Sequence, residues 1–259
     1  MTAPRLRATL IALLIPAGLY AGLCLLLFFT QRSQVYFPVG ESAAQGAVSM
    51  SFETEGATLK VWTVERPGPS ALIYFGGNAE DVGASIGAFA ERLPGHSLYF
   101  VNYRGYAGST GKPSESALVG DAIALYDRLQ ARHPKISVLG RSLGSGVAVQ
   151  LAGARTVDRL VLVTPFDSLV NVARAHFPWL PVRLLMLDRY DSAARAAGIQ
   201  APALVVIAEA DEIIPRVRTD ALTDAFSVRP RVLVLNGAGH NDLDLDPSYL
   251  REVAGFLAR

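Results

Sequence analysis

The chain has 259 residues, enough for one large α/β domain and a short additional segment. Its 24 lysines and arginines nearly balance 23 aspartates and glutamates, and the formal net charge of +1 argues against a nucleic-acid partner, which would usually require a clustered basic excess. Cys24 is the single cysteine, which excludes an intramolecular disulfide and a cluster of cysteine metal ligands.

The N-terminal segment contains a long apolar run. Residues 9–30 include no charged side chain, and about 20 apolar residues are enough to cross a bilayer as a helix. Arg5 and Arg7 precede the run and Arg32 follows it, an excess that favours a cytoplasmic N-terminus with the main domain outside the cytoplasm. We therefore expect residues 1–32 to form a single-pass membrane anchor.

Two other interpretations of this run are a cleaved signal peptide and a buried helix of a soluble protein. A signal peptide has a shorter apolar core and a site of small residues behind it, and neither feature is present. Leu23 stands before Cys24, where a lipoprotein cleavage site needs a small residue. A buried soluble helix rarely lacks polar residues on every face. These features favour an uncleaved anchor.

A connector over residues 33–47 leads into a domain that we assign to residues 48–259. Two strands at 48–53 and 58–64, joined at Glu55 and Gly56, predict a hairpin. Strands then alternate with helices: strands at 71–75, 97–102, 136–139, 159–163, 203–208 and 232–235, and helices at 80–93, 114–132, 143–153, 216–226 and 248–257. Uniformly apolar strands separated by helices predict a mostly parallel sheet covered on both faces.

Two local features qualify this alternating pattern. Asn78 stands where the helix at 80–93 needs an N-cap, and we expect it to serve as one. Residues 165–202 interrupt the alternation and are rich in proline, tryptophan and leucine. We expect this insertion to form a small cap over the carboxyl end of the sheet.

The sharpest chemical motif is a G-x-S-x-G formed by Gly140, Ser142 and Gly144. It follows the strand at 136–139 directly and opens a helix. Such a strand-to-helix turn lifts the serine hydroxyl out of the sheet and aims the first amides of the helix at the reacting centre. The motif alone is common in surface turns, but this context predicts that Ser142 is a nucleophile.

A serine nucleophile needs a base, and the base needs an acid that orients it. His240 follows the last predicted strand, and Asp211 follows the strand before it. In a parallel sheet both lie at the same edge as Ser142, and the order serine, aspartate, histidine is the one found on this kind of sheet. We expect Ser142, Asp211 and His240 to form a catalytic triad.

Other interpretations of these residues exist. His240 could be a turn histidine and Asp211 a helix N-cap, and the acid could instead be Glu209, Glu212 or Asp242. Among the remaining histidines, His96 and His133 are expected to be ordinary surface residues. His176, in the cap, either borders a substrate pocket or is another surface residue.

The tetrahedral intermediate of such a reaction also needs donors for its oxyanion, and preorganised backbone amides serve well. The amide of Leu143, at the start of the helix, is one candidate. The second is the amide of Asn78, in the loop that follows the strand at 71–75. A simple strand-to-helix turn would explain Gly76, Gly77 and Asn78 equally well, and both interpretations can hold together.

These motifs resemble one branch of the α/β-hydrolases, the BEM46-like proteins with the alpha/beta hydrolase domain-containing proteins 13 and 17. The resemblance runs from the end of the anchor almost to the C-terminus. It rests on Gln34-Val-Tyr-Phe-Pro38, Tyr74-Phe-Gly-Gly-Asn78, Asn102-Tyr-Arg-Gly-Tyr106, Gly140-Arg-Ser-Leu-Gly-Ser145, Asp188-Arg-Tyr-Asp-Ser192, Asp211-Glu-Ile-Ile-Pro215 and Gly239-His-Asn241.

The resemblance implies an α/β-hydrolase fold, one N-terminal membrane helix, a small cap and serine hydrolase activity. Members similar to protein 17 are protein depalmitoylases, which points to ester or thioester bonds. Many relatives have His-Gly where Gly76 and Gly77 stand, so the outer wall of the oxyanion loop differs here. Relatives also often have His-Gly where Ile207 and Ala208 stand. Neither difference removes a catalytic group.

The sequence therefore predicts a membrane-anchored serine hydrolase that cleaves an ester or thioester of a small-molecule or acylated substrate through an acyl-enzyme. No cofactor or metal is implied, because the sequence has no ligand cluster or phosphate loop. A peptidase acting on short peptides and a non-catalytic, membrane-tethered binding protein are the alternatives. A complete triad separates an enzyme from a binding protein, which has no need to keep all three groups in register.

Overall fold

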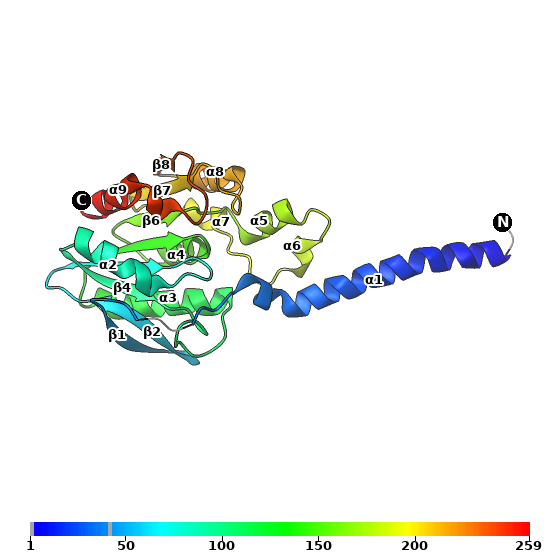
Figure 1. Ribbon diagram of the computed structural model, residues 1–259, viewed down its shortest axis with the longest axis horizontal. Coiled ribbons are helices and arrows are strands. Elements are labelled where there is room, and N and C mark those ends of the chain that lie inside the picture. The colour runs from blue at the N-terminus through cyan, green and yellow to red at the C-terminus, as the bar shows by residue number, and fades with distance from the viewer. Residues whose placement is uncertain (1–2, 41–42) are drawn as a thin grey trace.

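A computed structural model describes the backbone of residues 3–40 and 43–259, and the side chains of 12–40 and 43–259. Residues 1–2 of the predicted anchor and residues 41–42 of the predicted connector therefore lie outside the described residues. The side chains of Arg5 and Arg7 lie outside them as well. Helix α1 (Ala3–Val35) extends from the rest of the molecule as a stalk (Figure 1). Its part Ala12–Val35 is long and apolar enough to cross a membrane by length and composition.

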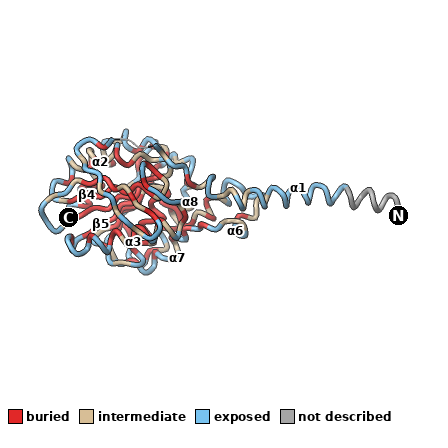
Figure 2. The backbone as a smooth tube through the Cα atoms, turned by 90° about the horizontal axis from the view of Figure 1, so that it is seen from below, coloured by how far each residue is buried: buried red, intermediate tan, exposed pale blue. Residues whose placement is uncertain are grey.

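Helix α1 is longer than the apolar run from which it was predicted. It continues through the polar residues Gln31 to Gln34 and ends at Val35, within the stretch expected to be connector. Pro16 lies inside the helix, as membrane helices tolerate. Most of the described side chains of the stalk, from residue 12 onward, are exposed, whereas the residues buried in the molecule lie in the domain at its base (Figure 2).

The domain is built on an eight-stranded sheet in the order β1-β2-β4-β3-β5-β6-β7-β8. The first two strands form the predicted hairpin, β2 pairs antiparallel with β4, and all later pairs are parallel. The strands are β1 (Val48–Thr54), β2 (Ala57–Val64), β3 (Ser70–Phe75), β4 (His96–Val101), β5 (Lys135–Arg141), β6 (Leu160–Val163), β7 (Ala203–Ala208) and β8 (Arg231–Leu235). With the helices around it, this sheet is the α/β-hydrolase fold expected from the sequence.

Helices cover both faces of the sheet and bury two apolar layers. Residues of α2 and α9 belong to the layer on one face, and residues of α3, α4, α7 and α8 to the layer on the other. The central strands are buried at nearly every position because both of their faces are covered. The helices are α2 (Val82–Arg92), α3 (Glu115–Gln130), α4 (Leu143–Ala154), α5 (Leu169–His176), α6 (Val182–Leu185), α7 (Ala193–Ala196), α8 (Arg216–Ala225), α9 (Pro247–Leu257) and the 3₁₀ turn η1 (Leu243–Leu245).

The insertion between β6 and β7 contains α5, α6 and α7. Helices α5 and α6 lie beside the base of α1, while α7 packs on α4 and α8 (Figure 1). Strand order reverses around β3, which lies between β4 and β5. Loops at the carboxyl ends of strands meet at such a point, and α1 and the cap close over this edge of the sheet.

Two expectations from the sequence are wrong. The N-cap of α2 is Asp81, whose side chain accepts a hydrogen bond from the Gly83 amide, and not Asn78. The chain turns once more before the helix, at Ala79, which has a φ of 58°. His133 is not a surface residue, since it is 4% exposed and its Nε2 lies 2.9 Å from the Tyr99 hydroxyl.

Candidate active site

Ser142 occupies a strained turn between β5 and α4. Its φ of 49° and ψ of −116° lie in a region that few residues other than glycine adopt. The flanking glycines are required sterically: a Cβ at Gly140 would lie 2.2 Å from the Gly144 oxygen, and a Cβ at Gly144 would lie 2.1 Å from the Phe75 oxygen. The turn therefore needs both glycines of the G-x-S-x-G motif, and it presents the Ser142 side chain to a cavity.

Ser142, His240 and Asp211 form a continuous hydrogen-bonded chain. Nε2 of His240 lies 2.9 Å from Oγ of Ser142, and Nδ1 lies 2.8 Å from Oδ2 of Asp211. Because a carboxylate only accepts hydrogen bonds, Nδ1 carries the proton and Nε2 is free to accept from the serine hydroxyl. His240 is 4% exposed, so the chain is shielded from water. This is the arrangement that activates a serine for nucleophilic attack.

The Asp211 carboxylate is held by its own loop. Its Oδ1 accepts hydrogen bonds from the amides of Ile213 at 2.9 Å and Ile214 at 2.7 Å. These bonds fix the orientation in which the carboxylate faces the imidazole ring of His240. The side chain therefore acts as a turn cap and as the partner of His240 at the same time.

The other three carboxylates considered for the acid contact backbone amides of the His240 loop. Oε2 of Glu209 accepts from the Gly237 amide at 2.8 Å, and Oδ1 of Asp242 accepts from the Gly239 amide at 2.5 Å. Oε2 of Glu212 lies 3.4 Å from the amide nitrogen of His240 itself. These contacts hold the His240 loop in its conformation, whereas Asp211 is the carboxylate that hydrogen-bonds to the imidazole ring of His240.

The two predicted oxyanion donors lie beside the nucleophile. Asn78 and Leu143 both line the cavity next to Ser142. The Leu143 amide is at the first position of α4, where a helix provides no acceptor. Within the described part of the chain, no acceptor contacts the Asn78 amide either. Both amides are thus available to an incoming oxyanion.

Glu80 holds the predicted oxyanion loop in place, a role that the sequence did not reveal. Its Oε2 accepts a hydrogen bond from the Gly77 amide at 2.6 Å and lies 3.5 Å from Nη1 of Arg141, the residue before Ser142. Its Oε1 accepts from the hydroxyl of Tyr74 at 2.5 Å. Burial opposes the charge on Arg141, but the Glu80 carboxylate raises the pKa of the guanidinium. One mostly buried carboxylate therefore connects the loop that carries Asn78 to the turn that carries Ser142.

The Asn78 side chain connects the same loop to α1. Its Nδ2 donates to the main-chain oxygen of Val35 at 2.7 Å, and its Oδ1 accepts from the Phe37 amide at 2.9 Å and the Tyr106 hydroxyl at 2.8 Å. Burial raises the pKa of Tyr106 to about 12, so its hydroxyl remains a donor at neutral pH. The end of the stalk helix is thereby attached to the loop that carries a predicted oxyanion donor.

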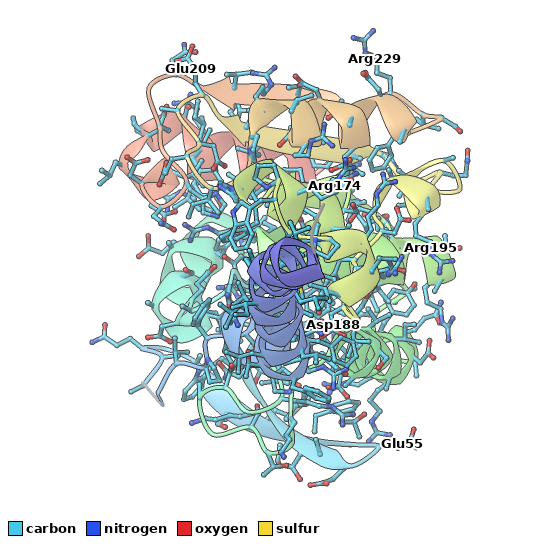
Figure 3. All side chains as sticks on the ribbon, turned by 90° about the vertical axis from the view of Figure 1, so that its right-hand side faces the viewer. Glu55, Arg174, Asp188, Arg195, Glu209 and Arg229 are labelled. Carbon is cyan, nitrogen blue, oxygen red and sulfur yellow. The ribbon has the colours of Figure 1, made fainter. Side chains whose placement is uncertain are left out.

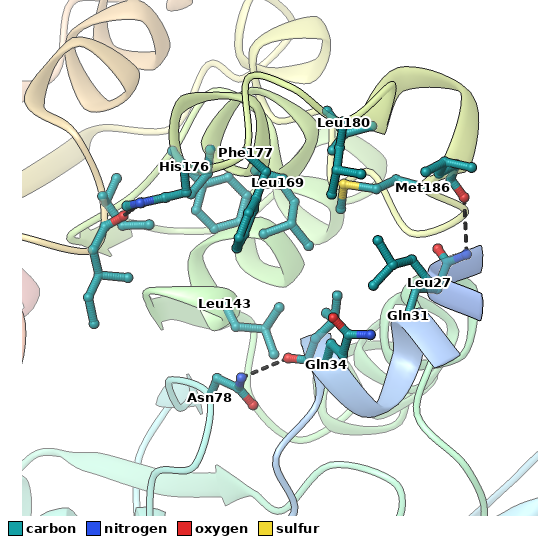
Figure 4. A pocket seen from close by; sticks show the side chains of 18 of the residues that line it. Leu27, Gln31, Gln34, Asn78, Leu143, Leu169, His176, Phe177, Leu180 and Met186 are labelled. Atoms are coloured by element: carbon teal, nitrogen blue, oxygen red, sulfur yellow. Dashed lines mark hydrogen bonds between the residues drawn. The ribbon is translucent and has the colours of Figure 1, made fainter. Parts of the chain in front are cut away.

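A cavity of about 510 Å³ opens next to Ser142 (Figure 4). Its walls come from α1, from α5 and α6 with the segment between them, and from the loops after β3, β5 and β7. Most of the lining side chains are aliphatic or aromatic, and no described Asp, Glu, Lys or Arg lines it. His176 borders this cavity, and its Nε2 lies 2.8 Å from the Ile213 oxygen. The surroundings of Ser142 suit an apolar group.

Among the residues that the structure describes, no group of three or more His, Cys, Asp and Glu side chains is arranged to hold a metal ion.

Comparisons with known proteins place the chain among relatives of similar length. No protein-family model matches it. An uncharacterized protein of Mycobacterium tuberculosis (strain H37Rv) is 36% identical over 242 residues, which are 87% of this chain and 85% of that protein. Alpha/beta hydrolase domain-containing protein 17B of Xenopus laevis is 30% identical over 201 residues, 74% of this chain and 68% of that protein.

Solved structures share the fold at lower identity. The Pyrococcus furiosus esterase Pf2001 superimposes with a TM-score of 0.70 at 17% identity, covering 85% of this chain and 98% of that one. Est1E of Butyrivibrio proteoclasticus, solved with ferulic acid bound, gives a TM-score of 0.63 at 17% identity, covering 81% of this chain and 96% of that one.

Proposed function

The chain belongs to the α/β-hydrolase family, and on this basis we propose that it is a membrane-anchored serine hydrolase that cleaves an ester or thioester through an acyl-enzyme. One observation carries the proposal. The Ser142 hydroxyl, on a strained turn at the edge of an apolar cavity, lies 2.9 Å from His240, whose other ring nitrogen lies 2.8 Å from Asp211.

The proposed reaction begins when Nε2 of His240 takes the proton from Ser142. The serine oxygen attacks the substrate carbonyl, and the amides of Leu143 and Asn78 bind the resulting oxyanion. His240 then donates its proton to the leaving alcohol or thiol, which departs and leaves an acyl-enzyme. Water, deprotonated by His240, attacks this ester, and the acid is released as Ser142 regains its proton.

The cavity supports an acyl substrate. Apolar lining next to the nucleophile favours a hydrocarbon group by removing its surface from water, at about 25 cal/mol for each Å². A peptide substrate would bring several amide groups that need hydrogen-bond partners, and few polar side chains line this space. We therefore favour esterase or thioesterase activity over the peptidase alternative.

We also propose that α1 anchors the enzyme in a membrane with its N-terminus in the cytoplasm. The length and composition of Ala12–Val35 support the anchor. Two arginines before the apolar run, Arg5 and Arg7, against Arg32 after it support the orientation. Fusion of alkaline phosphatase to the C-terminus tests it in a bacterial host, since that enzyme is active only after export. An inactive phosphatase fusion, together with fluorescence from a cytoplasmic reporter fused at the same position, would show the opposite orientation.

Active-site labelling tests the enzymatic proposal. The detergent-solubilised protein should react with a fluorophosphonate probe, and Ser142→Ala should abolish the labelling. Ser137→Ala is the matched control, because Ser137 is a buried serine on β5, the strand that precedes Ser142, and does not line the cavity. A folded protein that does not label, or a Ser142→Ala variant that still labels, contradicts the proposal and leaves a tethered binding protein as the alternative.

A further inference from the structure

Helix α1 supplies one wall of the cavity that contains Ser142. Five of its residues line the cavity: Leu23, Leu27, Gln31, Gln34 and Val35. All five lie within Ala12–Val35, the segment long and apolar enough to cross a membrane. The candidate membrane helix and the wall of the active-site cavity are therefore the same stretch of chain.

The cap provides the opposite wall. Its cavity-lining side chains are almost all apolar and come from α5, α6 and the segment between them, including Leu169, Val172, Leu180, Leu185 and Met186. Viewed from close by, the cavity lies between α1 and these residues, with Leu143 and Asn78 at its inner end (Figure 4). The space is a slot between the stalk helix and the cap, with the nucleophile at one end.

The slot runs along α1 towards the membrane. Its inner end is marked by Val35, whose oxygen is bonded to Asn78 beside Ser142. Leu23 marks the outer end, where it is 38% exposed, and the Tyr20 hydroxyl donates to the Trp179 oxygen there at 2.7 Å. From Leu23 to Val35 the helix rises by about 18 Å, close to the ~15 Å depth of one bilayer leaflet. The cavity-lining stretch of α1 therefore spans about the length of a single membrane acyl chain.

The cap also exposes large apolar side chains. Four of them are exposed: Leu184 and Leu187, which do not line the cavity, and Phe177 and Trp179, which line it. Apolar patches of this kind, with tryptophan among them, are typical of surfaces that lie in a membrane interface. The mouth of the slot at Leu23 would then open into hydrocarbon.

Polar contacts fix α1 to the cap and keep the slot in shape. Nε2 of Gln31 donates to the Leu185 oxygen at 3.0 Å, and Oε1 of the same amide accepts from the Leu187 amide at 2.7 Å. Nε of Arg32 lies 3.2 Å from Oδ2 of Asp188, which sits beside the base of α1 in the view along this helix (Figure 3).

Asp188 extends this attachment into the domain. Its Oδ2 accepts a hydrogen bond from the Tyr36 hydroxyl at 3.1 Å, and that hydroxyl lies 3.0 Å from the hydroxyl of Tyr190. Burial raises the pKa of both tyrosines, so they stay neutral hydrogen-bonding groups. The position of α1 against the cap is thus set by paired polar groups and not by apolar contact alone.

We propose that α1 is part of the substrate site: a long, unbranched acyl chain of a membrane-resident substrate enters from the bilayer and lies between α1 and the cap, with Leu27 and Leu23 against its outer half. This inference rests on the proposed hydrolase function and deepens it. The acyl carbonyl sits at Ser142, and the tail follows α1 outward. The membrane helix then forms one wall of the acyl-chain site, in addition to anchoring the protein.

Chain-length selectivity of full-length variants tests this proposal. The substrates are p-nitrophenyl esters from butyrate to palmitate, hydrolysed by the protein in detergent micelles. Leu27→Trp fills the slot part-way along, so kcat/KM for palmitate should fall at least tenfold while that for butyrate changes less than twofold. Leu23 lies one helical turn further out, so Leu23→Trp should allow longer chains than Leu27→Trp before activity is lost.

Leu26→Trp is the matched control. Leu26 neighbours Leu27 on the same helix, is 59% exposed and does not line the cavity, so this variant should keep the wild-type ratio of palmitate to butyrate activity. An unchanged ratio in both Leu27→Trp and Leu23→Trp, or an equal loss in Leu26→Trp, overturns the inference.

Fluorophosphonate labelling separates this result from failure of the proposed function. The small probe needs only Ser142 and its neighbours, so wild type and all three tryptophan variants should label. If wild type does not label, the hydrolase proposal itself fails. If Leu27→Trp alone does not label because it is misfolded, Leu27→Ala replaces it: the wider slot should raise activity on branched long-chain esters relative to wild type, and an unchanged preference contradicts the inference.

Discussion

Nδ2 of Asn78 donates a hydrogen bond to the main-chain oxygen of Val35 at 2.7 Å, and this bond attaches the predicted oxyanion loop to the end of α1. The last turn of a helix has carbonyl groups without partners in the helix, and Asn78 satisfies one of them. The same side chain accepts from the amide of Phe37. The stalk helix and the predicted oxyanion loop are therefore one structural unit.

Asn78→Ala should lower kcat by about tenfold, equivalent to about 1.4 kcal/mol, with a smaller change in KM. The backbone amide at position 78 remains, but the side chain that holds it is lost, so the donor is less well preorganised. Steady-state hydrolysis of a short p-nitrophenyl ester measures this split. A rise in KM with unchanged kcat would show that the side chain serves binding and not the oxyanion loop.

Glu80→Gln should destabilise the fold as well as slow the reaction. The substitution leaves the mostly buried Arg141 without this negative partner, and breaking a buried ion pair costs up to about 3–5 kcal/mol. Urea unfolding in detergent measures the loss. Asp220→Asn is the control, because Asp220 pairs with Arg216 at 2.7 Å on the exposed face of α8, where such a pair contributes about 1 kcal/mol or less. Equal losses in the two variants would mean that Glu80 has no special role.

Asp211→Asn should reduce kcat by roughly 10³- to 10⁴-fold while the protein stays folded, because an amide no longer holds the His240 ring in the required tautomer. Asp242→Asn is a matched change in the adjacent loop. Asp242 contacts the Gly239 amide and not the imidazole, so its variant should lose less than tenfold. The reverse order of losses in ester hydrolysis would assign the acid to Asp242.

The strand order explains why the sequence was informative about the site. Ser142, Asp211 and His240 each follow a strand, and parallel strands bring such loops to one edge, so residues about 100 positions apart could be expected to meet. The structure does bring these three side chains together. The apolar run of α1 and the apolar cap could also be predicted, each from its local composition.

The contact between α1 and the cap could not be read in this way. Gln31 and Leu185 are 154 positions apart, and the apolar pattern of each segment already has a local explanation, in membrane insertion for one and in cap formation for the other. Asn78 was misjudged for a related reason. An asparagine before a helix is a good N-cap by pattern, but the chain makes an extra turn at Ala79, and Asp81 is the N-cap instead. The Asn78 side chain hydrogen-bonds to the main-chain oxygen of Val35.

His133 gives a prediction about pH. It was expected at the surface because it borders loop residues, but its ring packs against Tyr99 on β4. Burial lowers the pKa of His133, so the unfolded chain binds this proton more tightly than the folded protein does. Its contribution to stability is complete above the ordinary histidine pKa of about 6.5 and is lost as the pH falls through the folded-state pKa.

The free energy of unfolding should therefore decrease as the pH falls from about 7 to 5, with a slope of at most about 1.4 kcal/mol per pH unit from this one proton. Burial also lowers the pKa of His96, which adds a change of the same sign. His133→Gln should flatten the dependence. Urea unfolding followed by tryptophan fluorescence at several pH values measures the wild type and this variant, and a slope that His133→Gln does not reduce would show that this buried ring is not its source.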